Sequence, residues 1–113
     1  MKKKKQHFIS IPLEEGVQKL AISDIYYIES QGHSMIYTTK KGDFISRGTM
    51  KELEEILKNY GFFRSNKGYL VNMKYVDGVK DMCCMIHGQQ LPVRRRKRKE
   101  FIEALIQYMS GVL

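Results

Sequence analysis

Basic side chains that could contact a polyanion stand in two short blocks of this sequence. Half of the 20 lysine and arginine residues lie in Lys2–Lys5 and Arg94–Lys99, and the formal net charge is +8. The remaining chain is close to neutral. A concentrated basic block indicates a polyanionic partner, which is a nucleic acid, an anionic membrane or an acidic protein.

Several basic side chains, inside and outside these blocks, carry the donors that DNA recognition requires. The planar guanidinium of Arg95 matches guanine O6 and N7, and the Lys67 ammonium can donate to guanine or to phosphate. Arg98 and Lys99 fall at the first turn of an expected helix, where the helix dipole disfavours cations, so we expect them to meet phosphates. A solvated helix face is the alternative interpretation of residues 94–99.

Polar residues elsewhere have two alternative roles each. Asn66 can bond an adenine edge or stabilise a turn, and Arg64 can contact DNA or form an ion pair on a sheet. Thr49 is mainly a helix cap that could also face the DNA backbone. His33, in a turn, is either a surface residue without a specific role or a hydrogen-bond donor to DNA. Asn72, at the end of an apolar strand, is expected to bond backbone groups.

The sequence offers little to a catalytic mechanism. It has neither a Gly-rich phosphate loop nor His, Cys, Asp and Glu residues at metal-ligand spacing. Cys83 and Cys84 are adjacent, which disfavours a bridge between them, so we expect reduced thiols and a cytoplasmic location. No apolar run approaches the roughly 20 residues needed to span a bilayer. We predict no enzyme activity, no cofactor, no metal and no membrane insertion.

The elements that must position these residues are mostly short strands. Apolar segments, rich in β-branched and aromatic residues, alternate with turn signals such as Lys41-Gly42-Asp43 and His87-Gly88, which is typical of antiparallel sheets. The expected strands are 8–11, 17–22, 25–28, 35–39, 44–45, 62–63, 69–72, 76–79, 82–86 and 90–93.

Two helices are expected among these strands. A capping-box pattern at Thr49–Glu52, followed by apolar residues at helical spacing, predicts a short helix near 50–59. An apolar stripe in the C-terminal segment predicts a second helix near 95–109. We expect residues 1–6 to form a flexible basic lead-in and residues 7–113 to form a single domain.

Several blocks, in order, resemble the LytTR family of bacterial DNA-binding domains. The resemblance runs from about residue 8 to residue 109, nearly the whole chain, and several spaced blocks in the right order make it specific. The blocks are Ile25–Ser30 with His33; Gly42–Phe44 and Arg47–Thr49 with Leu53, Glu54 and Leu57; Phe62–Arg64; Tyr69–Asn72; and Leu91–Val93 with the arginines after it, Lys99 and Phe101.

This resemblance implies a mainly β fold, with an elongated core of antiparallel sheets and short helices. It also implies three loops that enter successive DNA major grooves, with base contacts from His33, Lys67 and Arg95. The residues expected to contact the DNA backbone or to support the loops are Thr49, Arg64, Asn66, Gly68, Arg94, Arg98 and Lys99.

Two loops depart from the family pattern. Asn66-Lys67-Gly68 stands where the family usually has His-Arg-Ser or His-Lys-Ser, so a hydroxyl is missing at Gly68. Arg94-Arg95 stands where the family usually has Ser-Arg. Hydrogen-bond donors remain in each loop. We therefore expect the departures to affect which DNA sequence is bound and not whether DNA is bound.

The resulting hypothesis is sequence-specific binding of double-stranded DNA by the output domain of a bacterial two-component transcription regulator. The implied partners are DNA sites with paired direct repeats and, in a longer protein, a phospho-receiver domain. The free domain is expected to be a monomer that pairs on DNA. The alternatives are a non-specific cationic module for RNA or a membrane surface, and a protein-docking domain that uses the C-terminal helix stripe.

Overall fold

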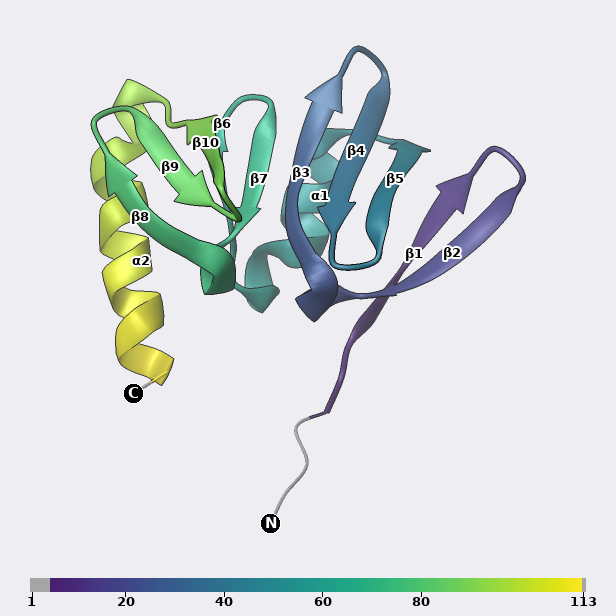
Figure 1. Cartoon of the computed structure of the whole chain (residues 1–113), viewed down its shortest axis with the longest axis horizontal. Coiled ribbons are helices and arrows are strands. Elements are labelled where there is room, and N and C mark those ends of the chain that lie inside the picture. Colours follow the sequence, from purple (N-terminus) through teal and green to yellow (C-terminus); the bar gives the residue numbers. More distant parts are fainter. Residues whose placement is uncertain (1–4, 113) are drawn as a thin grey trace.

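Over residues 5–112, the fold consists of three antiparallel sheets and two α-helices (Figure 1). The computed structural model describes residues 5–112, and the molecule measures 44 × 40 × 25 Å. Most of the basic lead-in expected at residues 1–6 lies outside the described residues. Lys5 and Gln6 are exposed and belong to no regular element.

Each sheet is built from strands that are close together in the sequence, except for one return connection. The central sheet has the order β5-β4-β3-β7-β6, so β6 and β7 come back to pair beside β3 after α1. Its strands are β3 (Ile25–Gln31), β4 (Ser34–Thr39), β5 (Gly42–Arg47), β6 (Phe62–Asn66) and β7 (Tyr69–Asn72). The flanking sheets are β1 (Phe8–Leu13) with β2 (Gly16–Ala21), and β8 (Val76–Lys80) with β9 (Cys83–Ile86) and β10 (Gln89–Pro92).

The first helix, α1 (Met50–Leu57), begins at the predicted cap. The Thr49 Oγ1 atom accepts a hydrogen bond from the Glu52 backbone N–H at 3.1 Å, which satisfies one of the free donors of the first turn. A 3₁₀ turn at Lys58–Tyr60 follows, and Gly61 ends it in the left-handed region at φ 82°. The predicted helix near 50–59 is therefore an α-helix continued by a 3₁₀ turn.

The second helix, α2 (Arg98–Val112), starts and ends about three residues later than the helix predicted near 95–109. Arg95–Lys97 form a 3₁₀ turn, in which the Lys97 N–H donates to the Arg94 carbonyl at 2.8 Å. The helical region near 95–109 is confirmed, but the basic block lies on a tight turn ahead of the α-helix.

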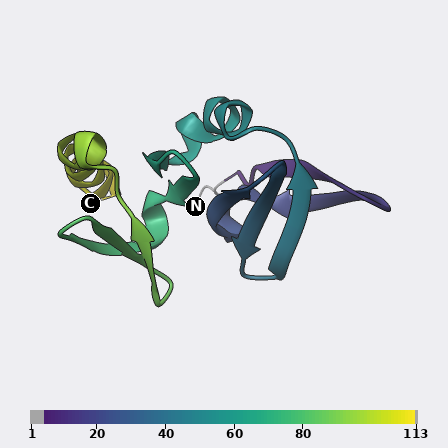
Figure 2. The same ribbon diagram turned by 90° about the horizontal axis from the view of Figure 1, so that it is seen from above.

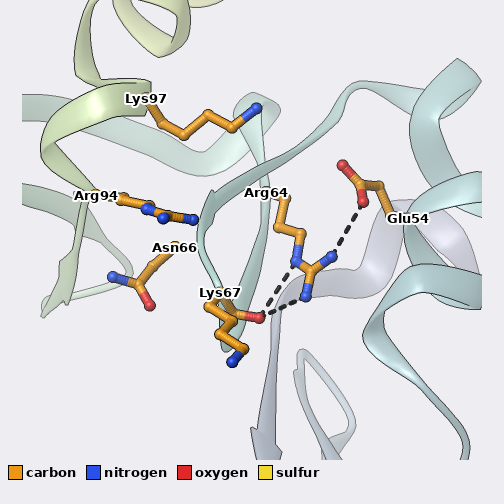
Figure 3. A pocket seen from close by; sticks show the side chains of 6 residues that line it. All are labelled: Glu54, Arg64, Asn66, Lys67, Arg94 and Lys97. Carbon is orange, nitrogen blue, oxygen red and sulfur yellow. Dashed lines mark hydrogen bonds and ion pairs between the residues drawn. The ribbon is translucent and has the colours of Figure 1, made fainter.

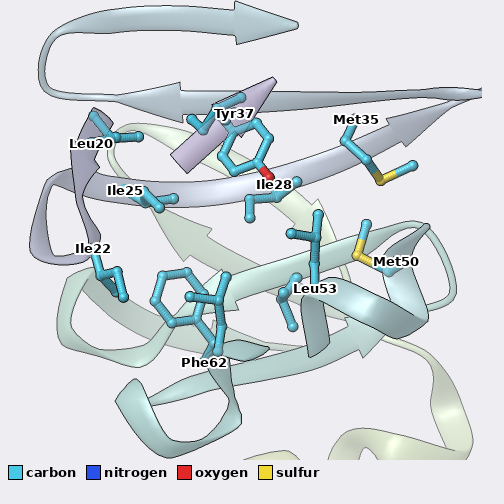
Figure 4. Close-up of a cluster of buried hydrophobic side chains, with 12 residues drawn as sticks. Leu20, Ile22, Ile25, Ile28, Met35, Tyr37, Met50, Leu53 and Phe62 are labelled. Atoms are coloured by element: carbon cyan, nitrogen blue, oxygen red, sulfur yellow. The ribbon is translucent and has the colours of Figure 1, made fainter. Parts of the chain in front are cut away.

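Two hydrophobic clusters lie on opposite faces of the central sheet. The first contains the buried Ile28 and Leu57 and is covered by α1 and by β1–β2 (Figure 4). The second contains Tyr27, Val71 and Phe101 and is covered by α2 and by β8–β10. Successive strand residues point to opposite faces, so neighbouring residues of β3 and of β7 enter different clusters. The view from above shows α2 at one end of the molecule and α1 near its middle (Figure 2).

The expected β-rich fold with three antiparallel sheets is confirmed, and each expected strand is present. The largest difference is β5, which spans Gly42–Arg47 and not only residues 44–45. Its polar residues pair with β4, for example Asp43 with Thr38 and Arg47 with Ser34. Backbone hydrogen bonds extend this strand beyond the short apolar pair that the sequence pattern detects.

Candidate nucleic-acid interface

The three loops singled out by the sequence lie along one edge of the molecule. The β3–β4 turn, the β6–β7 turn and the segment from β10 to α2 all stand at the upper edge in Figure 1. Main-chain hydrogen bonds join them in series: the Ser30 N–H donates to the Gly68 carbonyl at 2.9 Å, and the Arg94 N–H donates to the Ser65 carbonyl at 2.7 Å. The middle loop is thus fixed to both neighbours.

The middle loop owes its shape to an irregularity in β6. The register between β6 and β7 shifts between Phe63 and Asn66, which marks a bulge at residues 64–65. Ser65 is fully buried, and its hydroxyl donates to the Pro92 carbonyl at 3.2 Å. Asn66 closes the turn, because its Oδ1 atom accepts from the Gly68 N–H at 3.3 Å. The turn role proposed for Asn66 is therefore present in the structure.

A first recess, of about 400 Å³, opens between the β3–β4 and β6–β7 turns. His33, Thr49, Arg64, Lys67 and Gly68 are among the residues that line it. His33 is exposed, and it follows Gly32, whose φ of 58° permits the tight turn.

A second recess, of about 580 Å³, adjoins the first and shares Arg64 and Lys67 with it. Four cations and one carboxylate line it, together with an amide (Figure 3). The lining residues are Glu54, Arg64, Asn66, Lys67, Arg94 and Lys97. Cationic side chains around a hollow of this kind attract anions such as phosphate oxygens.

Arg64 is held by three hydrogen bonds. Its Nε and Nη2 atoms donate to the Lys67 carbonyl at 3.2 and 2.8 Å, and its Nη1 atom donates to Glu54 Oε1 at 3.3 Å. The ion-pair alternative weighed for Arg64 is thus present, with a carboxylate on α1 (Figure 3).

Three predicted residues lie outside both recesses. Arg95 and Lys99 are exposed on the turn and first helical residues that follow Arg94. Arg98 is partly buried, and its Nε donates at 2.7 Å to the carbonyl of Asp81, in the β8–β9 turn. That bond gives Arg98 a structural role, and its expected phosphate contact stays a prediction.

Sequence reasoning missed Glu54 and Lys97 as lining residues. Lys97 stands in the basic block, but only its place on a 3₁₀ turn directs it to the recess. Glu54 belongs to a block that resembles the family, but its spacing is that of a solvated helix residue, and the sequence assigns it no DNA-contacting or supporting role. Asn72 has the structural role expected of it, because its side chain donates to the Ile25 carbonyl at 2.9 Å and accepts from the Lys74 N–H at 3.1 Å.

The departure from the family pattern at Gly68 lies beside the Ser30 side chain. A Cβ atom placed on Gly68 would lie 3.1 Å from Ser30 Oγ, a closer approach than most Cβ contacts. The Ser30 hydroxyl therefore lies beside the position where the family pattern usually carries its own hydroxyl. A serine at position 68 would require the Ser30 hydroxyl to shift by a few tenths of an ångström.

Other chemistries find little support in the part of the chain that the structure describes. Over residues 5–112, His, Cys, Asp and Glu side chains form no group of three that could hold a metal ion. Burial raises the pKa of the Cys84 thiol to about 12, which suppresses the reactive thiolate. Neither described helix combines the length and the apolar character needed to cross a membrane.

Comparison with known proteins identifies the family of this chain. Residues 15–106 match the LytTr DNA-binding domain family. The chain therefore belongs to the LytTR family of DNA-binding domains.

Individual relatives fit the same family. The sensory transduction proteins LytT of Bacillus cereus and Bacillus anthracis are each 23% identical over 105 residues, which cover 88% of this chain and 43% of the relative. The chain thus spans less than half the length of these relatives. A solved LytTr DNA-binding domain of a methyl-accepting/DNA response regulator from Bacillus cereus has the same fold, with a TM-score of 0.73 at 16% identity over 90% of this chain and 98% of that one.

Proposed function

We propose that this chain binds double-stranded DNA sequence-specifically, as the output domain of a bacterial two-component regulator in the cytoplasm. The observation that carries the proposal is the edge where three donor-bearing loops are joined by main-chain hydrogen bonds. A preorganised edge loses little conformational entropy on binding, which favours specific contacts over loose electrostatic attraction.

Different residues serve different parts of this function. His33, Lys67 and Arg95, all exposed, are the proposed contacts to base edges. The phosphate backbone is met by Arg94 and Lys97, two of the four cations around the second recess. Phosphate contacts set the register of the protein on the duplex, and base contacts select the sequence.

The supporting residues hold this edge in place. Thr49 caps α1, Asn66 closes its own turn, and Gly68 leaves room for the Ser30 hydroxyl. Arg98 ties the start of α2 to the β8–β9 turn, and Lys99 beside it is proposed to meet a phosphate. We propose further that two copies, each a monomer when free, occupy paired direct repeats, so that the loops enter successive major grooves.

The relatives suggest the setting of the domain. The two LytT proteins named as sensory transduction proteins are more than twice as long as the segment that matches. We propose that this domain works in the same setting, coupled to a phospho-receiver domain that controls its pairing on DNA.

Selection of bound fragments from a random duplex library at physiological salt tests this function. The proposal predicts enrichment of paired repeats and a preference over random duplex of about 10³-fold or more at fixed salt. Salt-sensitive binding without enrichment would indicate the non-specific cationic module instead. A chain that binds no duplex would support the protein-docking alternative.

A further inference from the structure

One acidic side chain lies among the cations of the second recess. Glu54 lines it beside Arg64, Lys67, Arg94 and Lys97. A carboxylate at this place repels DNA phosphates and lowers the affinity for every duplex. Electrostatic attraction alone therefore gives no reason for its presence.

The contacts of Glu54 give a reason. Its Oε1 atom accepts from Arg64 Nη1 at 3.3 Å, while the other donors of the same guanidinium bond the Lys67 carbonyl. The Arg64 and Glu54 side chains are 27% and 43% exposed, so solvent reaches the pair. The guanidinium is planar, so a partner on each side fixes its orientation.

We propose that Glu54 is a specificity-determining residue of the DNA interface that acts through Arg64 and touches no DNA itself. It holds the guanidinium on the Lys67 carbonyl, which keeps the β6–β7 turn in the shape that presents Lys67. It also keeps the guanidinium away from phosphates. This inference rests on the proposed function, because it concerns the choice between one duplex and another.

Removing the carboxylate therefore has two consequences of opposite sign. Arg64 becomes available to a phosphate, so affinity for random duplex rises and the salt slope steepens by about one unit. The β6–β7 turn loses the contact that orients Arg64 on the Lys67 carbonyl, so the preference for the selected duplex falls by about two- to fivefold, the range expected for a solvent-accessible ion pair.

The test compares Glu54→Gln with Glu55→Gln, which makes the same charge change one residue away. Glu55 is exposed, pairs with Lys58 at 2.7 Å and does not line the recess. The probes are a duplex selected by the wild-type chain and a random-sequence duplex of equal length, each titrated at several salt concentrations. The preference should fall in Glu54→Gln alone. An equal preference in the two variants would overturn the proposal.

A second variant separates positioning from charge. Arg64→Lys keeps the positive charge but lacks the planar guanidinium that bonds the Lys67 carbonyl through two nitrogens and Glu54 through the third, so it should lower the preference as Glu54→Gln does. The double variant should then lose no more than Arg64→Lys alone, whereas independent losses that multiply would refute the coupling. Thermal unfolding of each variant verifies that the fold is retained.

The two levels of the account fail in different ways. If the wild-type chain selects no duplex, the proposed function and this inference both fall. If the wild-type chain selects a duplex and Glu54→Gln retains the full preference, only this inference falls.

Discussion

At the scale of single residues, Arg95 and Lys99 represent the two kinds of contact that the proposed function requires. Arg95→Ala should cost about 1–3 kcal/mol of binding free energy and relax the preference at one base pair. Lys99→Ala should weaken all duplexes alike and flatten the salt slope by about one unit. Titration of both variants with a selected and a random duplex measures these effects. An equal loss on both duplexes in Arg95→Ala would contradict the base contact.

A buried phenol makes stability depend on pH in the alkaline range. Burial raises the pKa of Tyr37 from 10.0 to about 12. The neutral phenol is favoured in the folded state, so its contribution is complete below pH 10 and is lost as the pH rises toward 12. The free energy of unfolding should fall over this window.

Urea unfolding of the wild-type chain and of Tyr37→Phe across this window provides the measurement. Between pH 10 and pH 12, Tyr37→Phe should lose less stability than the wild-type chain. Cys84, whose pKa is also raised to about 12, accounts for a share of the loss that remains. Identical losses in the two proteins would show that Tyr37 does not ionise on unfolding.

At the scale of elements, α1 depends on its cap. Thr49→Ala should lower the free energy of unfolding by about 1 kcal/mol, because the Glu52 N–H loses its acceptor. Thr49→Ser keeps the hydroxyl and should restore most of that loss. Urea unfolding followed by circular dichroism compares the three proteins. If the alanine and serine variants were equally stable, the hydroxyl would contribute nothing to the helix.

Elements are also where sequence reasoning succeeds most often. Alternation in β4 and the capping box at Thr49 predict local structure from local interactions, and both are present. The bulge at Arg64 and Ser65 could not be predicted from local sequence. Ser65 is buried, and its hydroxyl bonds the carbonyl of Pro92, which is distant in the sequence. The partner of Arg64, ten residues earlier in the chain, could not be predicted locally for the same reason.

At the scale of the whole molecule, the two hydrophobic clusters share the central sheet, so α2 must dock correctly for the DNA edge to form. Phe101 is fully buried and stacks on Phe63 with ring centroids 4.9 Å apart. Phe101→Ala should cost about 3–5 kcal/mol of stability. Ile106→Ala, on the same helix but 61% exposed, should change stability by no more than about 0.5 kcal/mol. Urea unfolding at equilibrium measures both, and similar losses would contradict the assigned packing.

The arrangement of the three loops is a property of the whole chain. Periodicity predicts the strands that flank His33 and Lys67, but not the return of β6 and β7 to the side of β3. The resemblance to the LytTR family supplied the expectation that these loops act together. The structure adds the main-chain hydrogen bonds from Ser30 to Gly68 and from Arg94 to Ser65, which hold the three loops along one edge.

Amide chemical-shift mapping with a selected duplex tests most directly whether that edge binds DNA. The account predicts perturbation at residues 32–33, 66–68 and 94–95. It predicts none at Lys40 and Lys41, which are also basic but lie in the β4–β5 turn at the opposite end of the strands (Figure 1). Perturbation of the Lys40–Lys41 turn with the three loops unchanged would contradict the account.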